Sequence, residues 1–357
     1  MRPSKFVTAI ALVSISAVAL LGQGQPRDPA RTPGVQAGQD PNRAAFLAAN
    51  CKTPPPAPAA GRGGRGGGGG AAVPQPTQEY VISDIPGVVA AGERWKVLWE
   101  EPGNNADGIV TVDDDGVLIA QNDKSDVLRV DRAGKTSVVY TDTYTGGALA
   151  ANAKGQLFIA ERSLNSAIWL LAPERRLFAN TLKGEPLDCV GGGVLNDIAA
   201  DNKGGVYFTM GGLYYANPQG VVSGRYGTIG GGGGGLILSP DEKTLYATGR
   251  PGVVGGGGMV AFDVQPDGSL TNERMFADIG NDGTTVDAAG RIYTVRQDGI
   301  VVFSPEGKVL GVIGAPRLFV SLAFGGPDKK TLFAAAIRDV QVMSIPMIAQ
   351  GYKGRPK

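Results

Sequence analysis

The stretch Asp282-Gly-Thr-Thr-Val-Asp-Ala-Ala-Gly-Arg-Ile-Tyr-Thr-Val295 decides the fold. It holds a polar residue, a short apolar run, an Asp-x-x-Gly turn and an alternating strand. Five related stretches begin at Asp107, Gly147, Asn196, Gly234 and Ser321. The apolar anchors after their turns are 39, 49, 39, 47 and 40 residues apart along the chain. A repeat of this length, built from strands and turns, is typical of a β-propeller, so we predict an all-β, six-bladed β-propeller.

Composition agrees with that fold class. The chain has 357 residues with 56 glycines and 7% aromatic residues, which suits a turn-rich all-β protein. We therefore predict one propeller over residues 78–350. The segment Trp95–Trp99 reads as an outer strand. We expect the segment around Tyr80 to pair with Val340–Ile345, so that the two ends of the propeller complete one blade and leave no open sheet edge.

The N-terminal part of the chain differs in composition from the repeats. Residues 1–25 have a basic start and an apolar run, which predicts a cleaved export signal, with an uncleaved membrane anchor as the alternative. Residues 26–77 are rich in Pro and Gly and are predicted to be a disordered, flexible linker with a short helix within Asp40–Asn50. We expect an exported, periplasmic or extracellular protein without stable membrane insertion after cleavage.

The chain contains two cysteines, Cys51 and Cys189. They can pair in an oxidising compartment. Because Cys51 falls in the segment predicted to be disordered, two unpaired thiols are the favoured interpretation, with a disulfide as the alternative.

The complete absence of histidine limits the chemistry. It excludes Ser-His-Asp and Cys-His catalysis and zinc bound through histidine. A formal net charge of +1 gives no broad basic face for nucleic acid. Carboxylates, lysine, tyrosine or a metal bound through oxygen remain as activating groups.

In a propeller the residue that leads each repeat precedes an innermost strand, so the six leading residues are predicted to meet at one end of the central channel. Asp107, Asn196 and Asp282 would supply oxygen ligands for one divalent cation, Ca²⁺ first, with Zn²⁺, Mn²⁺ or Mg²⁺ as alternatives. Turn formation with the local backbone is the competing interpretation of these residues. Glu161 and Ser321 are candidate substrate contacts, although for Glu161 and its neighbour Arg162 surface charge is the favoured interpretation.

Several phrases resemble the gluconolactonase/regucalcin (senescence-marker-protein-like) family of six-bladed propellers. They are Asn196-Asp-Ile-Ala-Ala-Asp201, Asp282-Gly-Thr-Thr-Val-Asp287, Val301-Val-Phe-Ser-Pro-Glu-Gly-Lys-Val-Leu-Gly311 and Ala323-Phe-Gly-Gly-Pro-Asp-Lys-Lys-Thr-Leu-Phe333. The likeness extends over residues 107–345. It implies one divalent metal in the channel and hydrolysis of a lactone or ester.

Carried over residue by residue, the resemblance makes Asn196 and Asp282 metal ligands and Asp282 also the base. Asp107 stands where the family has Glu, Gly234 replaces a ligand Asn, and Val194 replaces a substrate-holding Arg. The predicted function is an exported, monomeric, divalent-metal-dependent hydrolase of a small lactone or ester. The second hypothesis is a ligand- or protein-binding propeller that has lost catalysis.

Overall fold

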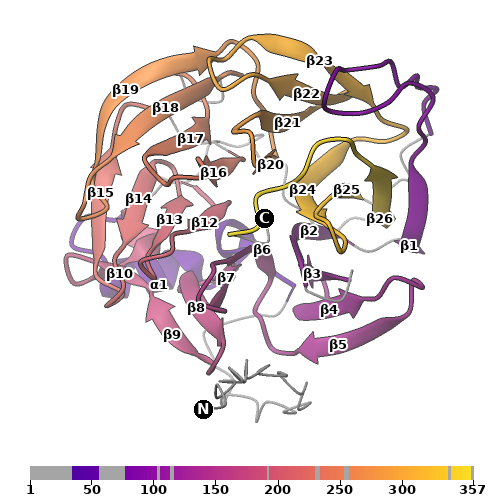
Figure 1. Ribbon diagram of the computed structural model, residues 1–357. Helices are drawn as coiled ribbons and strands as arrows, with labels where there is room; N and C mark the ends of the chain where they lie inside the picture. The colour runs from indigo at the N-terminus through magenta and orange to yellow at the C-terminus, as the bar shows by residue number, and fades with distance from the viewer. Residues whose placement is uncertain are drawn as a thin grey trace, which may run out of the picture.

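Six antiparallel four-stranded sheets surround a central axis (Figure 1). The computed structural model describes residues 34–55, 77–102, 105–112, 116–190, 193–229, 234–252, 257–336 and 339–354. The predicted all-β, six-bladed β-propeller is therefore confirmed. The predicted signal, residues 1–25, and residues 56–76 of the predicted linker lie outside the described residues.

The blades follow the repeats in chain order, and in each blade the first strand of the repeat is innermost. Blade 1 consists of β2 (Ala106–Thr111), β3 (Val117–Gln121), β4 (Asp126–Val130) and β5 (Thr136–Tyr140). Blade 2 consists of β6 (Gly146–Ala151), β7 (Leu157–Glu161), β8 (Ala167–Ala172) and β9 (Arg176–Ala179). Blade 3 consists of β12 (Ile198–Ala200), β13 (Val206–Thr209), β14 (Leu213–Ala216) and β15 (Val222–Tyr226). Blades 4 and 5 consist of β16 (Leu236–Leu238), β17 (Thr244–Thr248), β18 (Met259–Val264) and β19 (Leu270–Ala277); and β20 (Thr284–Val286), β21 (Ile292–Arg296), β22 (Gly299–Phe303) and β23 (Val309–Gly314). Blade 6 consists of β24 (Phe319–Gly325), β25 (Thr331–Ala336), β26 (Asp339–Pro346) and β1 (Lys96–Pro102).

The core lies between neighbouring blades rather than on one side of each sheet. In β13, Tyr207 packs toward blade 4 and Phe208 packs toward blade 2, and both are 0% exposed. The Tyr207 ring lies 4.4 Å from the ring of Tyr215 on the next strand. Because both faces of an inner strand are covered by other blades, apolar residues run continuously instead of alternating with polar ones.

The Asp-x-x-Gly turn of blade 3 fixes the start of its second strand. The Oδ1 atom of Asp201 accepts hydrogen bonds from the backbone amides of Lys203, Gly204 and Gly205. Its Oδ2 atom accepts from the hydroxyl of Tyr215 at 2.7 Å. One carboxylate thus holds both the turn and the third strand of its blade.

Blade 6 closes the ring with a strand from the N-terminal side of the propeller. β1 pairs antiparallel with β26, so the predicted pairing of the Tyr80 segment with residues 340–345 was wrong. The Tyr80 segment reaches blade 5 instead, through a single bridge between Ile82 and Ile313. Pro86, which has no amide proton, lies in a turn that interrupts this segment, whereas β1 offers seven consecutive residues to its partner.

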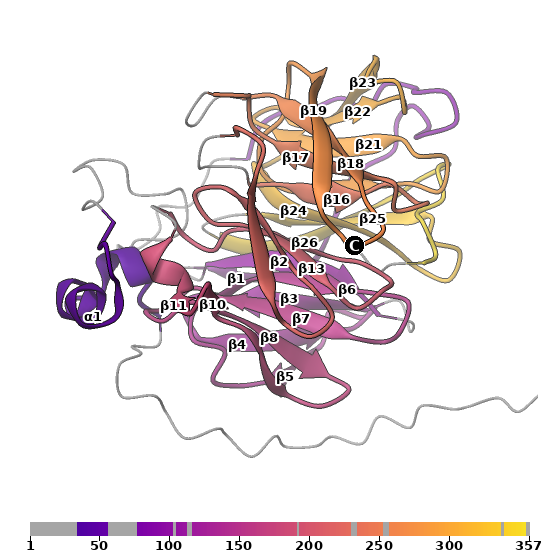
Figure 2. The same cartoon turned by 90° about the vertical axis from the view of Figure 1, so that its left-hand side faces the viewer.

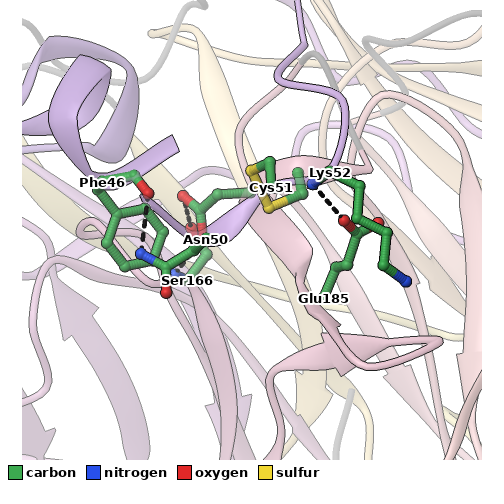
Figure 3. The surroundings of a disulfide bond; sticks show 8 residues. Phe46, Asn50, Cys51, Lys52, Ser166 and Glu185 are labelled. Carbon is green, nitrogen blue, oxygen red and sulfur yellow. Dashed lines mark hydrogen bonds between the residues drawn. A yellow bond between two sulfur atoms is a disulfide. The ribbon is translucent and has the colours of Figure 1, made fainter. Parts of the chain in front are cut away.

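A disulfide joins the N-terminal segment to the connection between blades 2 and 3 (Figure 3). The helix α1 (Arg43–Asn50) confirms the helix expected within Asp40–Asn50. It ends at Cys51, which is bonded to Cys189 with the two Cα atoms 5.4 Å apart. The amide of Lys52 donates to the Glu185 carboxylate at 2.6 Å. The prediction of two unpaired thiols was wrong because the helix and these contacts hold Cys51 against the propeller.

The segment before α1 is also ordered, so the disorder predicted for residues 26–77 is wrong for residues 34–55. It includes the short 3-10 helix η1 (Ala37–Gln39), and a second one, η2 (Leu187–Cys189), follows the ribbon of β10 (Thr181–Leu182) and β11 (Glu185–Pro186). α1 and the C-terminal end of the chain lie on opposite faces of the ring (Figure 2). Within the described ranges, no helix has the length and apolar character needed to cross a membrane.

Candidate functional site

The residues that lead the six repeats lie at the same end of the innermost strands. Three of them fall within strands β2, β6 and β24, and three precede strands β12, β16 and β20 by two residues. Each innermost strand packs beside the innermost strands of the neighbouring blades. The leading residues therefore face one end of the channel, and we call this end the channel mouth.

The group at the centre of the channel mouth is the guanidinium of Arg162, which follows β7. This side chain is 1% exposed. Its Nη1 donates to Oδ2 of Asp107 at 2.6 Å, and its Nε donates to the carbonyl of Leu195 at 2.9 Å. Its Nη2 donates to the backbone carbonyl of Asn196 and lies 3.3 Å from the Asn196 side-chain oxygen. Arg162 thus links blade 1 to blade 3 across blade 2.

Gly147 makes room for this arginine. A Cβ atom at Gly147 would lie 1.9 Å from Cζ and 2.0 Å from Nη1 of Arg162. Contacts this short do not occur between nonbonded atoms, so any side chain at this position would displace the guanidinium. The guanidinium of Arg162 therefore packs directly against the backbone of Gly147, the glycine that leads the second repeat.

Asp282 is the carboxylate with the most perturbed ionisation in the channel mouth, and it is half-buried. Burial raises the pKa of its carboxyl well above the usual range, and the negative charges of Asp107 and Asp197 raise it further. The positive charge of Arg162 and a hydrogen bond from the Gly283 amide lower the pKa by less. A carboxyl group with a raised pKa holds a proton more tightly than an ordinary aspartate, and such groups are common among catalytic acids and bases.

The guanidinium of Arg162 interacts with all three predicted ligands, Asp107, Asn196 and Asp282. Asp107 and Asn196 both contact Arg162, and Asp282 interacts through charge with Asp107 and Arg162. Neighbouring Asp197 has a different environment: its Oδ2 accepts from the Leu236 amide at 2.7 Å and ties blade 3 to blade 4.

The two predicted substrate contacts both have partners within the protein. Glu161 is 0% exposed and its carboxylate lies 3.7 Å from the guanidinium of Arg175, away from the contacts of Arg162. The hydroxyl of Ser321 accepts from the Ile109 amide at 3.2 Å, which joins blades 6 and 1. The favoured interpretation of Glu161 and Arg162 as surface charge was wrong, because both side chains are buried.

Two of the three departures from the family pattern change the space and the charge at the channel mouth. A Cβ atom at Gly234 would lie 2.3 Å from Oδ1 of Asp282, so an asparagine there requires Asp282 to move. Val194 is half-buried and carries no charge to hold a substrate.

These residues do not fit the divalent cation that the family resemblance implies. The oxygens of Asp107 and Asn196 that would bind it already face the guanidinium of Arg162. Moreover, the part of the chain that the structure describes contains no group of three or more His, Cys, Asp or Glu residues placed to hold a metal ion. Arg162 was interpreted from the sequence as surface charge because this residue leads no repeat. It reaches the channel mouth from the end of β7, a second strand.

Comparison with known proteins agrees with the fold and the repeat. The model of the SMP-30/gluconolactonase/LRE-like region matches residues 107–338. A gluconolactonase from Zymomonas mobilis is 24% identical over 257 residues, which cover 68% of this chain and 63% of that protein. The match thus spans less than two thirds of this relative's length.

Two solved structures show the same architecture. A gluconolactonase from Xanthomonas campestris superposes with a TM-score of 0.61 at 21% identity, covering 76% of this chain and 99% of that one. A calcium-binding protein, regucalcin, from Agrobacterium tumefaciens gives a TM-score of 0.58 at 18% identity, covering 74% and 97%. The fold and the matched residues 107–338 define a propeller of the gluconolactonase type. The chain belongs to the SMP-30/gluconolactonase/LRE-like family.

Proposed function

We propose that the chain hydrolyses lactones or related carboxylic esters at the channel mouth. The observation that carries this proposal is Asp282, a half-buried carboxylate with a raised pKa beside a buried guanidinium. Membership of the family and the similarity to a gluconolactonase support the substrate class.

In this reaction Asp282 acts as the general base. It accepts a proton from a water molecule while the water oxygen bonds to the carbonyl carbon, and the carbonyl π electrons move onto the carbonyl oxygen. When the tetrahedral intermediate collapses, the bond between the carbonyl carbon and the ring oxygen breaks, and Asp282 returns its proton to that oxygen. The positive charge of Arg162 favours negative charge developing near it. We assign no step to a divalent cation because the residues around Asp107 do not fit one.

The test is hydrolysis of a six-membered sugar lactone and an aryl ester by the native chain and by Asp282→Asn. Ring opening yields an acid, so a pH indicator follows the reaction. Loss of the base should lower the rate by at least about 100-fold. The matched control is Asp278→Asn, since the Asp278 side chain is 86% exposed and should not affect the rate. Activity of Asp282→Asn within about threefold of the native rate would contradict the assignment, because a general base contributes at least about 100-fold.

A ligand- or protein-binding propeller without catalysis is the second candidate. The absence of a charged side chain at Val194 and the lack of space at Gly234 favour it. In that case a lactone would raise the melting temperature of the native chain, but the lactone ring would stay closed.

We also propose export to the periplasm or the extracellular space. The apolar run within residues 1–25 supports this proposal. The disulfide between Cys51 and Cys189 also supports it, because such bonds persist in oxidising compartments. Fractionation of cells expressing the full chain would test it, and a cytoplasmic product with intact residues 1–25 would contradict it.

A further inference from the structure

Arg162 has contacts that go beyond the supporting charge assigned to it above. All three nitrogens of its guanidinium donate to oxygen atoms: Nε and Nη2 to backbone carbonyls, and Nη1 to the carboxylate of Asp107. Four of the six leading residues surround it or interact with it electrostatically, namely Asp107, Gly147, Asn196 and Asp282. A fixed positive charge therefore lies at the point where side chains from several blades meet.

This charge competes directly with a metal ion for ligands. A Ca²⁺ ion binds oxygen atoms at about 2.3–2.6 Å. Nη1 of Arg162 lies 2.6 Å from Oδ2 of Asp107, and Nη2 lies 3.3 Å from the side-chain oxygen of Asn196. An ion that shared these oxygens would lie against the guanidinium, where two like charges in a poorly hydrated space repel strongly.

The arginine is also held too firmly to move aside. Its side chain is 1% exposed, and its contacts with Leu195 and Asn196 are to main-chain carbonyls, which cannot rotate away as side chains can. Its own backbone carbonyl accepts from the Ala37 amide at 2.8 Å, so the N-terminal segment holds the residue from the other side. Displacement would break these bonds and leave a buried charge without partners.

We infer that the guanidinium of Arg162 is the permanent cation of the channel mouth. It occupies the place that the family resemblance gives to a divalent metal, and the chain binds no divalent cation through Asp107, Asn196 and Asp282. This inference concerns binding and does not depend on whether the chain hydrolyses lactones. Where the proposed function also holds, hydrolysis continues in the presence of a chelator.

The experiment measures Ca²⁺ and Mn²⁺ binding by calorimetry to the full chain after treatment with chelator and dialysis. The native chain should show no saturable binding up to about 10 mM, well above the dissociation constants of weak extracellular calcium sites. Arg162→Met removes the charge but keeps an unbranched side chain. It frees the oxygens of Asp107 and Asn196, and we expect it to gain one divalent site per chain, with a dissociation constant of about 1 mM or lower.

Two further variants locate the new site. Adding Asp107→Asn to Arg162→Met should remove the gained binding. Arg175→Met is the matched control, since Arg175 is another largely buried arginine paired with a carboxylate, at Glu161, and it should gain no site. If Arg162→Met does not fold, Arg162→Gln replaces it, because a polar side chain can still bond the carbonyl of Leu195.

Two results would overturn the inference. One is stoichiometric binding by the native chain that Asp107→Asn or Asp282→Asn removes. The other is a folded Arg162→Met or Arg162→Gln protein that gains no divalent site. Because no substrate is present, failure of the proposed hydrolysis would leave both measurements unchanged.

Discussion

Gly147→Ala tests the packing at the channel mouth with a single methyl group. The added Cβ would lie 1.9 Å from Cζ of Arg162, so the guanidinium must leave its bonds to Asp107, Leu195 and Asn196. Separating a buried charge from its partners costs about 3–5 kcal/mol. Since domains are stable by about 5–15 kcal/mol, the variant should still fold but with a large part of its stability lost.

The assay is urea denaturation followed by tryptophan fluorescence. Gly38→Ala is the control, because a Cβ at Gly38 has no atom within 4 Å and its φ is not in the left-handed region. That substitution should change the free energy of unfolding by less than about 0.5 kcal/mol. If Gly147→Ala were within about 1 kcal/mol of the native chain, well below the cost of separating a buried pair, the arginine would not be held as described.

Two substitutions and two deletions test other parts of the structure. Because the folded state raises the pKa of Asp282, ionisation of this group favours unfolding as pH rises through the raised pKa. Asp282→Asn should therefore be more stable than the native chain above that pH while losing hydrolysis. Equal or lower stability of the variant above that pH would contradict the raised pKa. The same shift predicts that kcat/KM of the native chain falls as pH decreases through a value above the usual carboxyl range. Cys51→Ser should lower the free energy of unfolding by about 2–4 kcal/mol, and an unchanged denaturation midpoint would show that the bond to Cys189 is dispensable. Deleting Lys96–Pro102 should leave blade 6 without its outer strand and yield insoluble protein. Deleting residues 77–83 removes the bridge between Ile82 and Ile313, the buried Ile82 side chain and the hydrogen bonds of Gln78, so it should lower stability but leave six complete blades and a soluble fold. A soluble product from the first deletion and an insoluble one from the second would refute the ring closure.

The sequence predicted the blades well because one physical pattern recurs in it. The register of the repeats also predicted that Asp107, Asn196 and Asp282 belong together, since in a propeller equivalent positions face the same end of the channel. Those predictions need only the spacing of turns and apolar residues, and both are local properties.

The errors all concern contacts that repeat spacing does not encode. Arg162 was misjudged because its partners, Leu195 and Asn196, belong to the next blade and bind it partly through main-chain oxygens. Cys51 was misjudged because the composition of the Pro/Gly-rich stretch after it was applied to the helix before it. A signal for Arg162 was present in Gly147, a small residue at a register position where four of the six repeats carry polar side chains.

The bond from the Ala37 amide to the Arg162 carbonyl has a practical consequence. A shortened protein that starts at residue 78, where the repeats make a natural place to cut, would lack this amide and half of the disulfide. It would keep every blade yet lose the outer support of its central arginine. Such a fragment should therefore be less stable at the channel mouth than the full chain, because the N-terminal segment supports Arg162 from outside the ring.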